Sequence, residues 1–241
     1  MKAFSYSIAE EIFAKYPGYV RGVVVADGVV NRPSPDELTT LLREAEASVR
    51  TRMNLENVAE HPRIKSWREA YRAFGAKPSE FRSSIEAMAR RALRGEPLPS
   101  INALVDIGNA VSLKYLTPVG GHALDDVKGD LCLRPAVGNE IFISFESDEV
   151  DSPLPGEIIF AEENTVLTRR WTWRQAKHTL TLLSTRAIEF NVDGLPPVTQ
   201  TEVEQICVEL GGLVNRFCGG RWQYQILSAE NPRIRIDGYH E

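Results

Sequence analysis

The sequence predicts an α+β fold, a single domain in which helices pack on mixed or antiparallel β-sheet layers. Helix signals concentrate between residues 35 and 94, strand-like runs dominate from Asp130 onward, and one helix pattern and one strand close the chain. This order differs from the regular alternation that a parallel sheet requires. With 241 residues, 43% of them apolar, the chain can bury a sizeable core. No low-complexity linker divides residues 1–241.

The first half supplies strand and helix signals in turn. Apolar, β-branched residues predict a strand over 19–26, ended by the turn pair Asp27-Gly28. Ser34 and Glu37 have the spacing of a capping box, so a helix should start at Pro35 and run to about Arg52. The remaining expected elements are a short strand or helix start over 1–17, a helix over 62–74 stopped by Gly75, and a helix from 78–79 to about 94 stopped by Gly95.

The second half reads as strands joined by Gly, Pro and acidic turns. One long helix with Thr199 or Thr201 near its start is expected over 197–217. The expected strands are 131–134, 140–145, 157–161, 165–171, 186–190 and a closing strand over 222–227.

A polar stripe interrupts the apolar run 98–116. Asn102, Asp106 and Asn109 recur at spacings of four and three, which puts them on one face of a helix. Polar groups in an apolar segment cost free energy unless they find partners. The run breaks at Thr117-Pro118-Val-Gly-Gly, which we expect to deliver His122 on a flexible loop. We interpret the stripe as the floor, and His122 as the rim, of a small-molecule pocket.

Arginines and tryptophans alternate in the run 169–174. On a strand, Arg170, Thr172 and Arg174 would share one face, and Trp171 and Trp173 the other. Such a face suits a phosphate, a carboxylate or a nucleotide end, and an exposed strand with buried tryptophans is an equal alternative. The candidate substrate-binding set is Asn102, Asp106, Arg170, Trp171, Arg174 and Thr179.

A basic segment lies in an otherwise acidic chain. Between Pro62 and Gly95 there are nine Lys or Arg and three Glu, whereas the whole chain carries a net charge of −5. A localised basic face can meet a nucleic-acid backbone, and a solvated helical surface explains the same charge. The candidate RNA-binding residues are Arg63, Lys65, Arg68, Arg72, Arg90 and Arg91.

Several classes of protein lack their sequence signals here. No run of 18 apolar residues suggests a membrane span, and the N-terminus does not resemble a signal peptide, so we expect a cytoplasmic protein. The three cysteines form no CxxC pair and the four histidines no ligand pair, so we expect no metal and no cofactor. No nucleophile elbow or phosphate-cradling glycine loop is convincing. The sequence sets no oligomeric state.

An ordered set of motifs resembles the B3/B4 domain of the phenylalanyl-tRNA synthetase β subunit. That family carries a run RPINxxVDITNYVxxxxGQPxHAFD followed by GxIxVRxAxxGE. The counterparts here are Pro-Ser-Ile-Asn102-Ala-Leu-Val-Asp106-Ile-Gly-Asn109, then Gly-Gly-His122-Ala-Leu-Asp125, then Gly129-Asp-Leu-Cys-Leu-Arg134-Pro-Ala. The flanks, including Trp67 to Ser79, look like free-standing members without synthetase modules. The core resemblance covers about 62–190, and we expect residues 1–241 to form one B3/B4-like domain.

The resemblance implies hydrolysis of an aminoacyl ester, because the synthetase domain removes mischarged tyrosine from tRNA. Carried over by position, Asn109 and His122 are the candidate catalytic residues, and Asn102 and Asp106 belong to the same motifs. Gly108 stands where the family has threonine, and Pro99 where it has arginine. The carboxylate that reads the tyrosine hydroxyl falls near Ser184, so the resemblance does not carry tyrosine specificity to this chain.

Three functions remain open at this stage. The first is a free-standing editing-like hydrolase that binds tRNA and deacylates it in trans. The second is a non-catalytic module that binds RNA or an amino-acid derivative, which the departures at Gly108 and Pro99 favour. The third is a hydrolase or sensor for a small amino-acid-like ligand with no RNA partner, which the net charge of −5 suits.

Overall fold

The computed structural model describes residues 3–237 and confirms the α+β class. Its α-helices are α1 (Glu10–Lys15), α2 (Asp36–Arg52), α3 (Pro62–Ala73), α4 (Ser84–Leu93), α5 (Ala103–Tyr115) and α6 (Gln200–Cys218). The strands are β1 (Phe4–Ile8), β2 (Val20–Asp27), β3 (Val119–Ala123), β4 (Leu131–Pro135), β5 (Phe142–Ile143), β6 (Val150–Asp151), β7 (Ile158–Glu162), β8 (Thr165–Arg169), β9 (Arg174–Gln175), β10 (Ala187–Gly194), β11 (Arg221–Leu227) and β12 (Arg233–Ile236). Short 3₁₀ turns lie at Val58–Glu60 and Lys177–Thr179.

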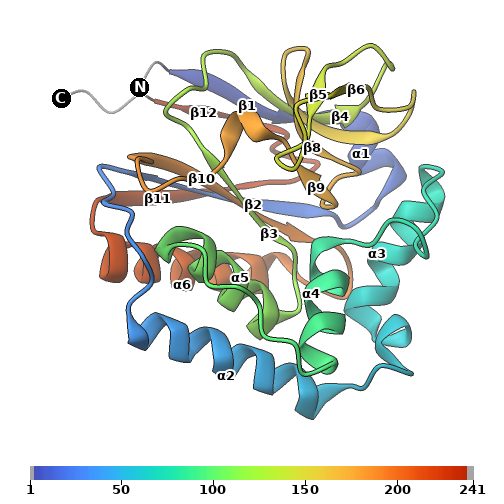
Figure 1. The fold of residues 1–241 in the computed structure, drawn as a ribbon. Helices are drawn as coiled ribbons and strands as arrows, with labels where there is room; N and C mark the ends of the chain where they lie inside the picture. The colour runs from blue at the N-terminus through green and yellow to red at the C-terminus, as the bar shows by residue number, and fades with distance from the viewer. Residues whose placement is uncertain (1–2, 238–241) are drawn as a thin grey trace.

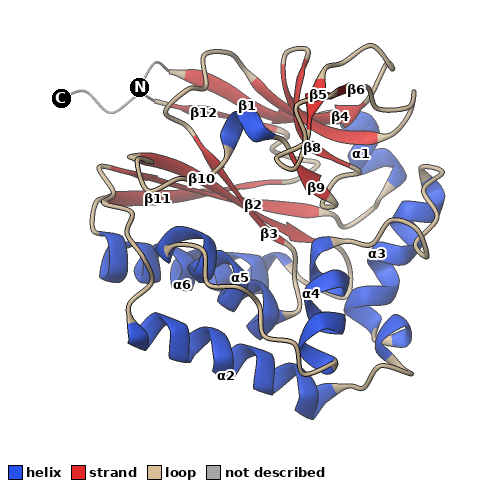
Figure 2. Ribbon diagram, viewed as in Figure 1, coloured by secondary structure: helices blue, strands red, loops and turns tan. Residues whose placement is uncertain are grey.

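Two sheets and a helical layer are stacked on one another (Figure 1). The upper sheet has the order β12-β1-β4-β7-β8-β9 and is mixed, because β1 runs parallel to β4. The lower sheet, β11-β2-β10-β3, is antiparallel throughout. Helices α5 and α6 cover its outer face, α2 packs on α5, and α3 and α4 stand at one side (Figure 2). The first and last described strands, β1 and β12, pair with each other.

The middle of the lower sheet is buried on both faces, and strand alternation sorts its side chains. On β10, Ile188, Phe190 and Val192 join the apolar core under α5 and α6. Glu189 and Asp193 alternate with them and are buried between the two sheets. The apolar face therefore anchors the helices, and the other face is left to polar groups.

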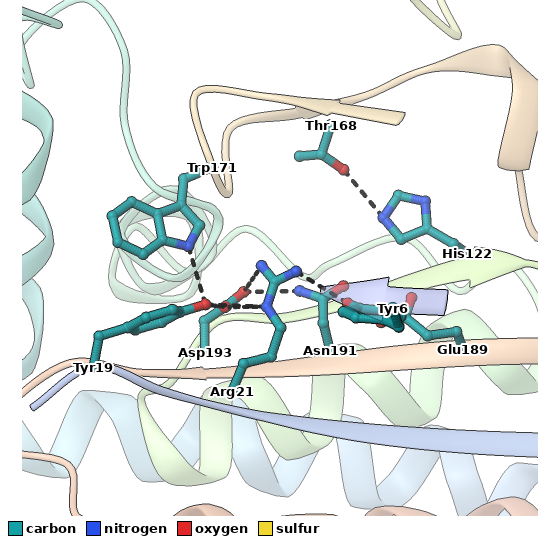
Figure 3. Close-up of polar contacts among 9 residues, drawn as sticks. All are labelled: Tyr6, Tyr19, Arg21, His122, Thr168, Trp171, Glu189, Asn191 and Asp193. Atoms are coloured by element: carbon teal, nitrogen blue, oxygen red, sulfur yellow. Dashed lines mark hydrogen bonds and ion pairs between the residues drawn. The ribbon is translucent and has the colours of Figure 1, made fainter. Parts of the chain in front are cut away.

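These polar groups form a buried row that holds the two sheets together. Arg21 of β2 donates from Nε to Asp193 Oδ1 at 2.8 Å and from Nη2 to Asp193 Oδ2 at 3.1 Å, and both side chains are 0% exposed. Tyr19 donates to Asp193, and Tyr6 of β1 donates to Glu189 at 2.8 Å and accepts from Arg21 at 3.0 Å. We call Arg21, Glu189, Asn191 and Asp193, with Tyr6 and Tyr19, the buried polar row (Figure 3). Tyr6 is the link that the upper sheet contributes.

The predicted elements are mostly present, but one expected helix cap and several expected boundaries are wrong; β8 ends at Arg169 and not at 171, and β10 extends to Gly194 and not to 190. Ser34 does not cap α2: Pro35 occupies the cap position and the Ser34 hydroxyl donates to Asp106 instead. Helix α4 begins at Ser84, because residues 77–81 form a separate turn and Ser83 supplies the cap. The strand expected over 140–145 shrinks to Phe142–Ile143, and β12 was not predicted. Among the helices of residues 3–237, none combines the length and the hydropathy that a bilayer crossing requires.

The buried ion pair generates a test of stability. Asp193→Leu leaves the Arg21 charge buried between the sheets without a counter-charge. The variant should therefore lower the free energy of unfolding by about 3–5 kcal/mol in urea titrations. The double variant Arg21→Met/Asp193→Leu removes both charges and should recover a large part of this loss. A double variant no more stable than Asp193→Leu alone would contradict this role for the pair.

Candidate functional site

A cavity of about 590 Å³ opens between the two sheets where β3 forms the edge of the lower one. Helix α5, strand β3, the β8–β9 connection and the segment 180–182 surround it. Its lining is mainly apolar and aromatic, with Ile101, Phe145 and Leu182 exposed at the mouth. Arg21, His122, Phe160, Trp171 and Asn191 are buried and form the floor. We call this space the β3-edge cavity.

Strand β3 presents backbone groups to the open side of its sheet. Backbone hydrogen bonds to β10 flank the strand at both ends. The Asp193 N–H donates to Pro118 O at 3.0 Å, and the Leu124 N–H donates to Ala187 O at 2.9 Å. Antiparallel pairing alternates, so Val119 and Gly121 direct their N–H and C=O groups away from β10. Gln175 already donates to Gly121 O at 2.9 Å. The edge can therefore offer main-chain hydrogen bonds to a ligand in the cavity.

His122 lies on a strand, and its prediction on a flexible loop is wrong. It pairs in register with Glu189 of β10 and is 2% exposed. Its Nδ1 is 2.7 Å from Thr179 Oγ1 and its Nε2 is 3.1 Å from Thr168 Oγ1. Burial, and then the charge of Arg21, lowers the pKa of His122 to about 3. The imidazole is neutral at physiological pH, so it can orient a hydroxyl or a water but cannot serve as a proton-donating acid.

The Gly120-Gly121 pair serves close packing instead of flexibility. A Cβ on Gly120 would lie 2.8 Å from Asn191 Oδ1, and one on Gly121 would lie 3.0 Å from the Phe190 ring, on the opposite face. Neither glycine has a positive φ angle. Both positions therefore need a small residue because β10 side chains lie against them.

The polar stripe of α5 divides into two parts. Asn102 caps the helix by accepting from Val105 N–H at 3.1 Å and donates to Thr181 O at 2.9 Å. Asp106 accepts from the Ser34 and Ser100 hydroxyls and from the Ile101 N–H, so two loops occupy its carboxylate. Only Asn109 lines the cavity, and its amide makes no hydrogen bond to other groups in the described chain. The stripe is partly a scaffold, and Asn109 is its one group free for a ligand.

The arginine–tryptophan run turns sharply, so the predicted alternation is wrong. Arg170 and Trp171 have φ angles of 47° and 65°, because the buried indole enters the core and donates to Tyr19 at 3.3 Å. Trp171 contacts Trp67, Tyr16 and Tyr19 edge-on, with ring centroids 4.8–5.1 Å apart.

The two arginines of the run separate. Arg170 stacks over the Phe81 ring at 3.7 Å and pairs with Glu157 at 3.5 Å, outside the cavity lining. Arg174 lines the cavity, as do Trp171 and Trp173. Thr179 lies behind His122 and fixes its ring. Of the candidate substrate-binding residues, Trp171 and Arg174 therefore face the cavity directly.

Much of the basic segment is paired internally. The buried Glu86 accepts from Arg68 at 2.8 Å and from Arg90 at 2.9 Å. Arg63 pairs with Glu202 at 2.5 Å, Lys65 lies 3.7 Å from Glu60, Arg91 donates to Pro97 O, and Arg72 is exposed.

A second hollow, of about 380 Å³, adjoins the cavity across Trp173 and Gln175, which line both. Arg82, Arg90, Arg94 and Arg174 line it together with Glu80 and Glu146. We call it the arginine groove. Of the six candidate RNA-binding residues, only Arg90 lies in its wall.

Arg21 and Asn191 are the floor residues that sequence reasoning missed. A signal was present, because Glu189, Asn191 and Asp193 alternate with apolar residues and Arg21 interrupts an apolar strand. Period-two alternation places such groups on one face of a sheet. No group of three or more His, Cys, Asp or Glu suited to a metal ion occurs within residues 3–237.

The structure is that of an α+β protein with a mainly apolar cavity at the edge of a buried sheet. The model of the B3/4 domain family matches residues 66–207, so the chain belongs to that family, as the motifs predicted. Among solved structures, the chain is similar to an N-terminal fragment of the phenylalanyl-tRNA synthetase β subunit from Pyrococcus horikoshii, with 11% identity and a TM-score of 0.46. That match covers 90% of this chain and 49% of the fragment, so the chain spans about half of its length. A search of curated proteins found no match.

Glu189 gives a pH-dependent test of the buried floor. Burial raises the pKa of Glu189 from 4.5 to about 8, so the folded chain holds a proton that the unfolded chain releases above about pH 4.5. The stability that the protonated Glu189 contributes is fully present below about pH 4.5. It is lost as the pH rises to about 8, where the free energy of unfolding has fallen by about 1.4 kcal/mol per pH unit. Relative to Glu189→Gln, the wild-type free energy of unfolding should fall with this slope between about pH 5 and 8 in urea titrations. Parallel curves for the two proteins would rule out a protonated Glu189.

Proposed function

We propose that this protein is a free-standing editing-like hydrolase that binds tRNA and removes a mischarged amino acid in trans. The observation that carries the proposal is the β3-edge cavity, whose 590 Å³ suit an amino-acid side chain with the adjoining ester. All of its lining residues except Arg21 lie within residues 66–207, the part of the chain that the B3/4 family model matches. Such a substrate agrees with the predicted cytoplasmic location. The pairing of β1 with β12 supports the prediction that residues 1–241 act as one domain.

The reaction requires attack of water on the ester carbonyl carbon. The water oxygen bonds to that carbon, the bond to the terminal ribose oxygen breaks, and the ribose oxygen takes a proton. Asn109 supports this step because its amide is free and can donate to the ester oxygen. The edge N–H groups of Val119 and Gly121 are further donors for developing charge. His122, neutral and held by two threonines, orients water or the ribose hydroxyl through Thr168.

The arginine groove is the route that we propose for the tRNA end. Its four arginines exceed its two glutamates, and it shares Trp173, Arg174 and Gln175 with the cavity. A phosphate-bearing chain in the groove would place its last ribose beside the cavity mouth. The other candidates, Arg63, Lys65, Arg68, Arg72 and Arg91, would contact RNA only if the duplex extends along α3 and beyond the groove.

A non-catalytic binding module is the second candidate, and one observation favours it. No Asp, Glu, Lys, Cys or Tyr lines the cavity, and His122, whose pKa is lowered to about 3 by burial, is a weak base, so the lining lacks an efficient general base. The third function, binding of a small amino-acid derivative without RNA, would use the same cavity lining. Turnover measurements separate these alternatives.

The hydrolase proposal predicts deacylation of at least one mischarged tRNA. Purified protein is incubated with a panel of mischarged tRNAs, and release of the amino acid is followed. Asn109→Ala should lower kcat by about 10²-fold, as expected for loss of a donor to the reacting oxygen. Asn215→Ala is the matched control, because Asn215 is a helical asparagine outside the cavity. Binding of tRNA without release of any amino acid would overturn the hydrolase in favour of the binding module.

The groove proposal predicts a difference between two pairs of basic residues. Arg82→Ala/Arg94→Ala should weaken tRNA binding and reduce the slope of log K against log salt by about one to two units. Lys65→Ala/Arg72→Ala changes the net charge equally but alters residues outside the groove, so its slope should equal the wild type. The reverse pattern in filter-binding titrations would place the RNA along α3.

A further inference from the structure

The connection between β5 and β6 is acidic and reaches the arginine groove. Residues 146–151 include four carboxylates, at Glu146, Asp148, Glu149 and Asp151. Phe145 and Glu146 line the groove, and Phe145 also lines the β3-edge cavity. The β5–β6 hairpin lies beside β8, a strand of the upper sheet (Figure 1). We call residues 144–151 the acidic strap.

Both ends of the strap are fixed to the body of the protein. Strand β5 pairs with β6, and Asp151 of β6 forms an ion pair with the buried Arg169. At the other end, Ser144 is buried and forms a bridge with Ala176. Between these ends, residues 145, 146, 148 and 149 are exposed. The strap is therefore a short loop with fixed ends and a solvent-exposed tip.

Two exposed ion pairs join the tip to the body. Glu146 Oε2 lies 3.3 Å from Arg174 Nη1, and Asp148 Oδ1 lies 2.5 Å from Lys177 Nζ. The four side chains are between 38% and 89% exposed. Ion pairs with this exposure contribute little stability, and salt weakens them further. Separating the tip from the body therefore costs little free energy.

Arg174 is the groove arginine best placed to bind a phosphate next to the ester. Its guanidinium lies over the Trp173 ring at 4.7 Å, and among the four groove arginines it alone also lines the cavity. Arg90 and Arg94 donate hydrogen bonds to glutamates of their own segment. Within residues 3–237, by contrast, Arg174 meets Glu146 in an ion pair and donates no side-chain hydrogen bond. A phosphate can accept two parallel hydrogen bonds from a guanidinium, so it can replace Glu146 there.

We propose that the acidic strap is an autoinhibitory contact, in which Glu146 occupies Arg174 in the free protein and a phosphate of the RNA end displaces it. This inference rests on the proposed function, because it takes the RNA end to lie in the arginine groove. Phe145 moves with Glu146, and its ring lines both the groove and the cavity. An ester carried by RNA therefore opens the strap, whereas an ester without phosphates leaves it in place.

A double-mutant cycle on Glu146 and Arg174 tests the strap. Binding of a labelled, deacylated tRNA is measured by fluorescence anisotropy at low salt. Glu146→Gln should tighten binding about two- to fivefold, because the phosphate no longer competes with a carboxylate for Arg174. This gain should vanish when Arg174→Gln is also present, because no guanidinium is then released.

Glu80→Gln is the matched control. Glu80 also lines the groove, but it pairs with Lys77, which does not line it. Glu80 and Glu146 are 55% and 56% exposed, so both variants should fold. The two substitutions change the net charge equally, so a gain in Glu80→Gln reports only repulsion between a carboxylate and the RNA. That gain should be the same with and without Arg174→Gln.

The outcomes separate the strap from the proposed function. Unchanged binding in Glu146→Gln, or an equal gain with and without Arg174→Gln, would overturn the strap while tRNA binding stands. Failure of both the wild type and Glu146→Gln to bind any tRNA, together with failure to deacylate any mischarged tRNA, would overturn both.

Discussion

The buried ion pair between Arg21 and Asp193 is the interaction on which the arrangement of this protein depends. A guanidinium and a carboxylate with no solvent exposure can remain charged only if each is fully partnered. Tyr19 and Asn191 donate further hydrogen bonds to Asp193, and Tyr6 accepts from Arg21. These partners come from β1, β10 and the residue that precedes β2, so satisfying one charge pair fixes how the two sheets meet.

The burial of the Arg21–Asp193 ion pair between the sheets determines the geometry of the cavity. Because Asp193 must point between the sheets, strand alternation points Asn191 and Glu189 the same way. Strand β3 pairs with β10 in one register, which places His122 opposite Glu189 and Gly120 opposite Asn191. On the other side, the Trp171 indole donates to Tyr19, and the left-handed backbone at residues 170–171 allows it to do so. The cavity is the space that remains between these two fixed walls.

The sequence was sufficient for the fold class, most elements and the family, because these depend on local periodicity and on ordered motifs. The sequence was insufficient where a residue's structural role depends on a partner far away in the chain. Ser34 has the spacing of a helix cap, yet Asp106, 72 positions away, takes its hydroxyl. Gly120 and Gly121 suggest a flexible loop, yet β10 side chains explain both. Arg170 and Trp171 do not continue the alternation of a strand, because the Trp171 indole is buried in the core and the backbone turns there. Asn109 and His122 both line the cavity, but His122 does so from a strand in the floor and not from a loop at the rim. The place of Asn191 becomes visible only once β3 and β10 are paired.

The central claim of this account is that the β3-edge cavity holds an aminoacyl group with its side chain on the polar floor. A crystal structure of the protein with a non-hydrolysable aminoacyl-adenosine analogue tests this most directly. The account predicts the amino-acid side chain in the cavity beside His122, the ester next to Asn109 and the adenosine beside Arg174. An adenine ring on the floor, or an analogue bound only outside the cavity, would contradict it.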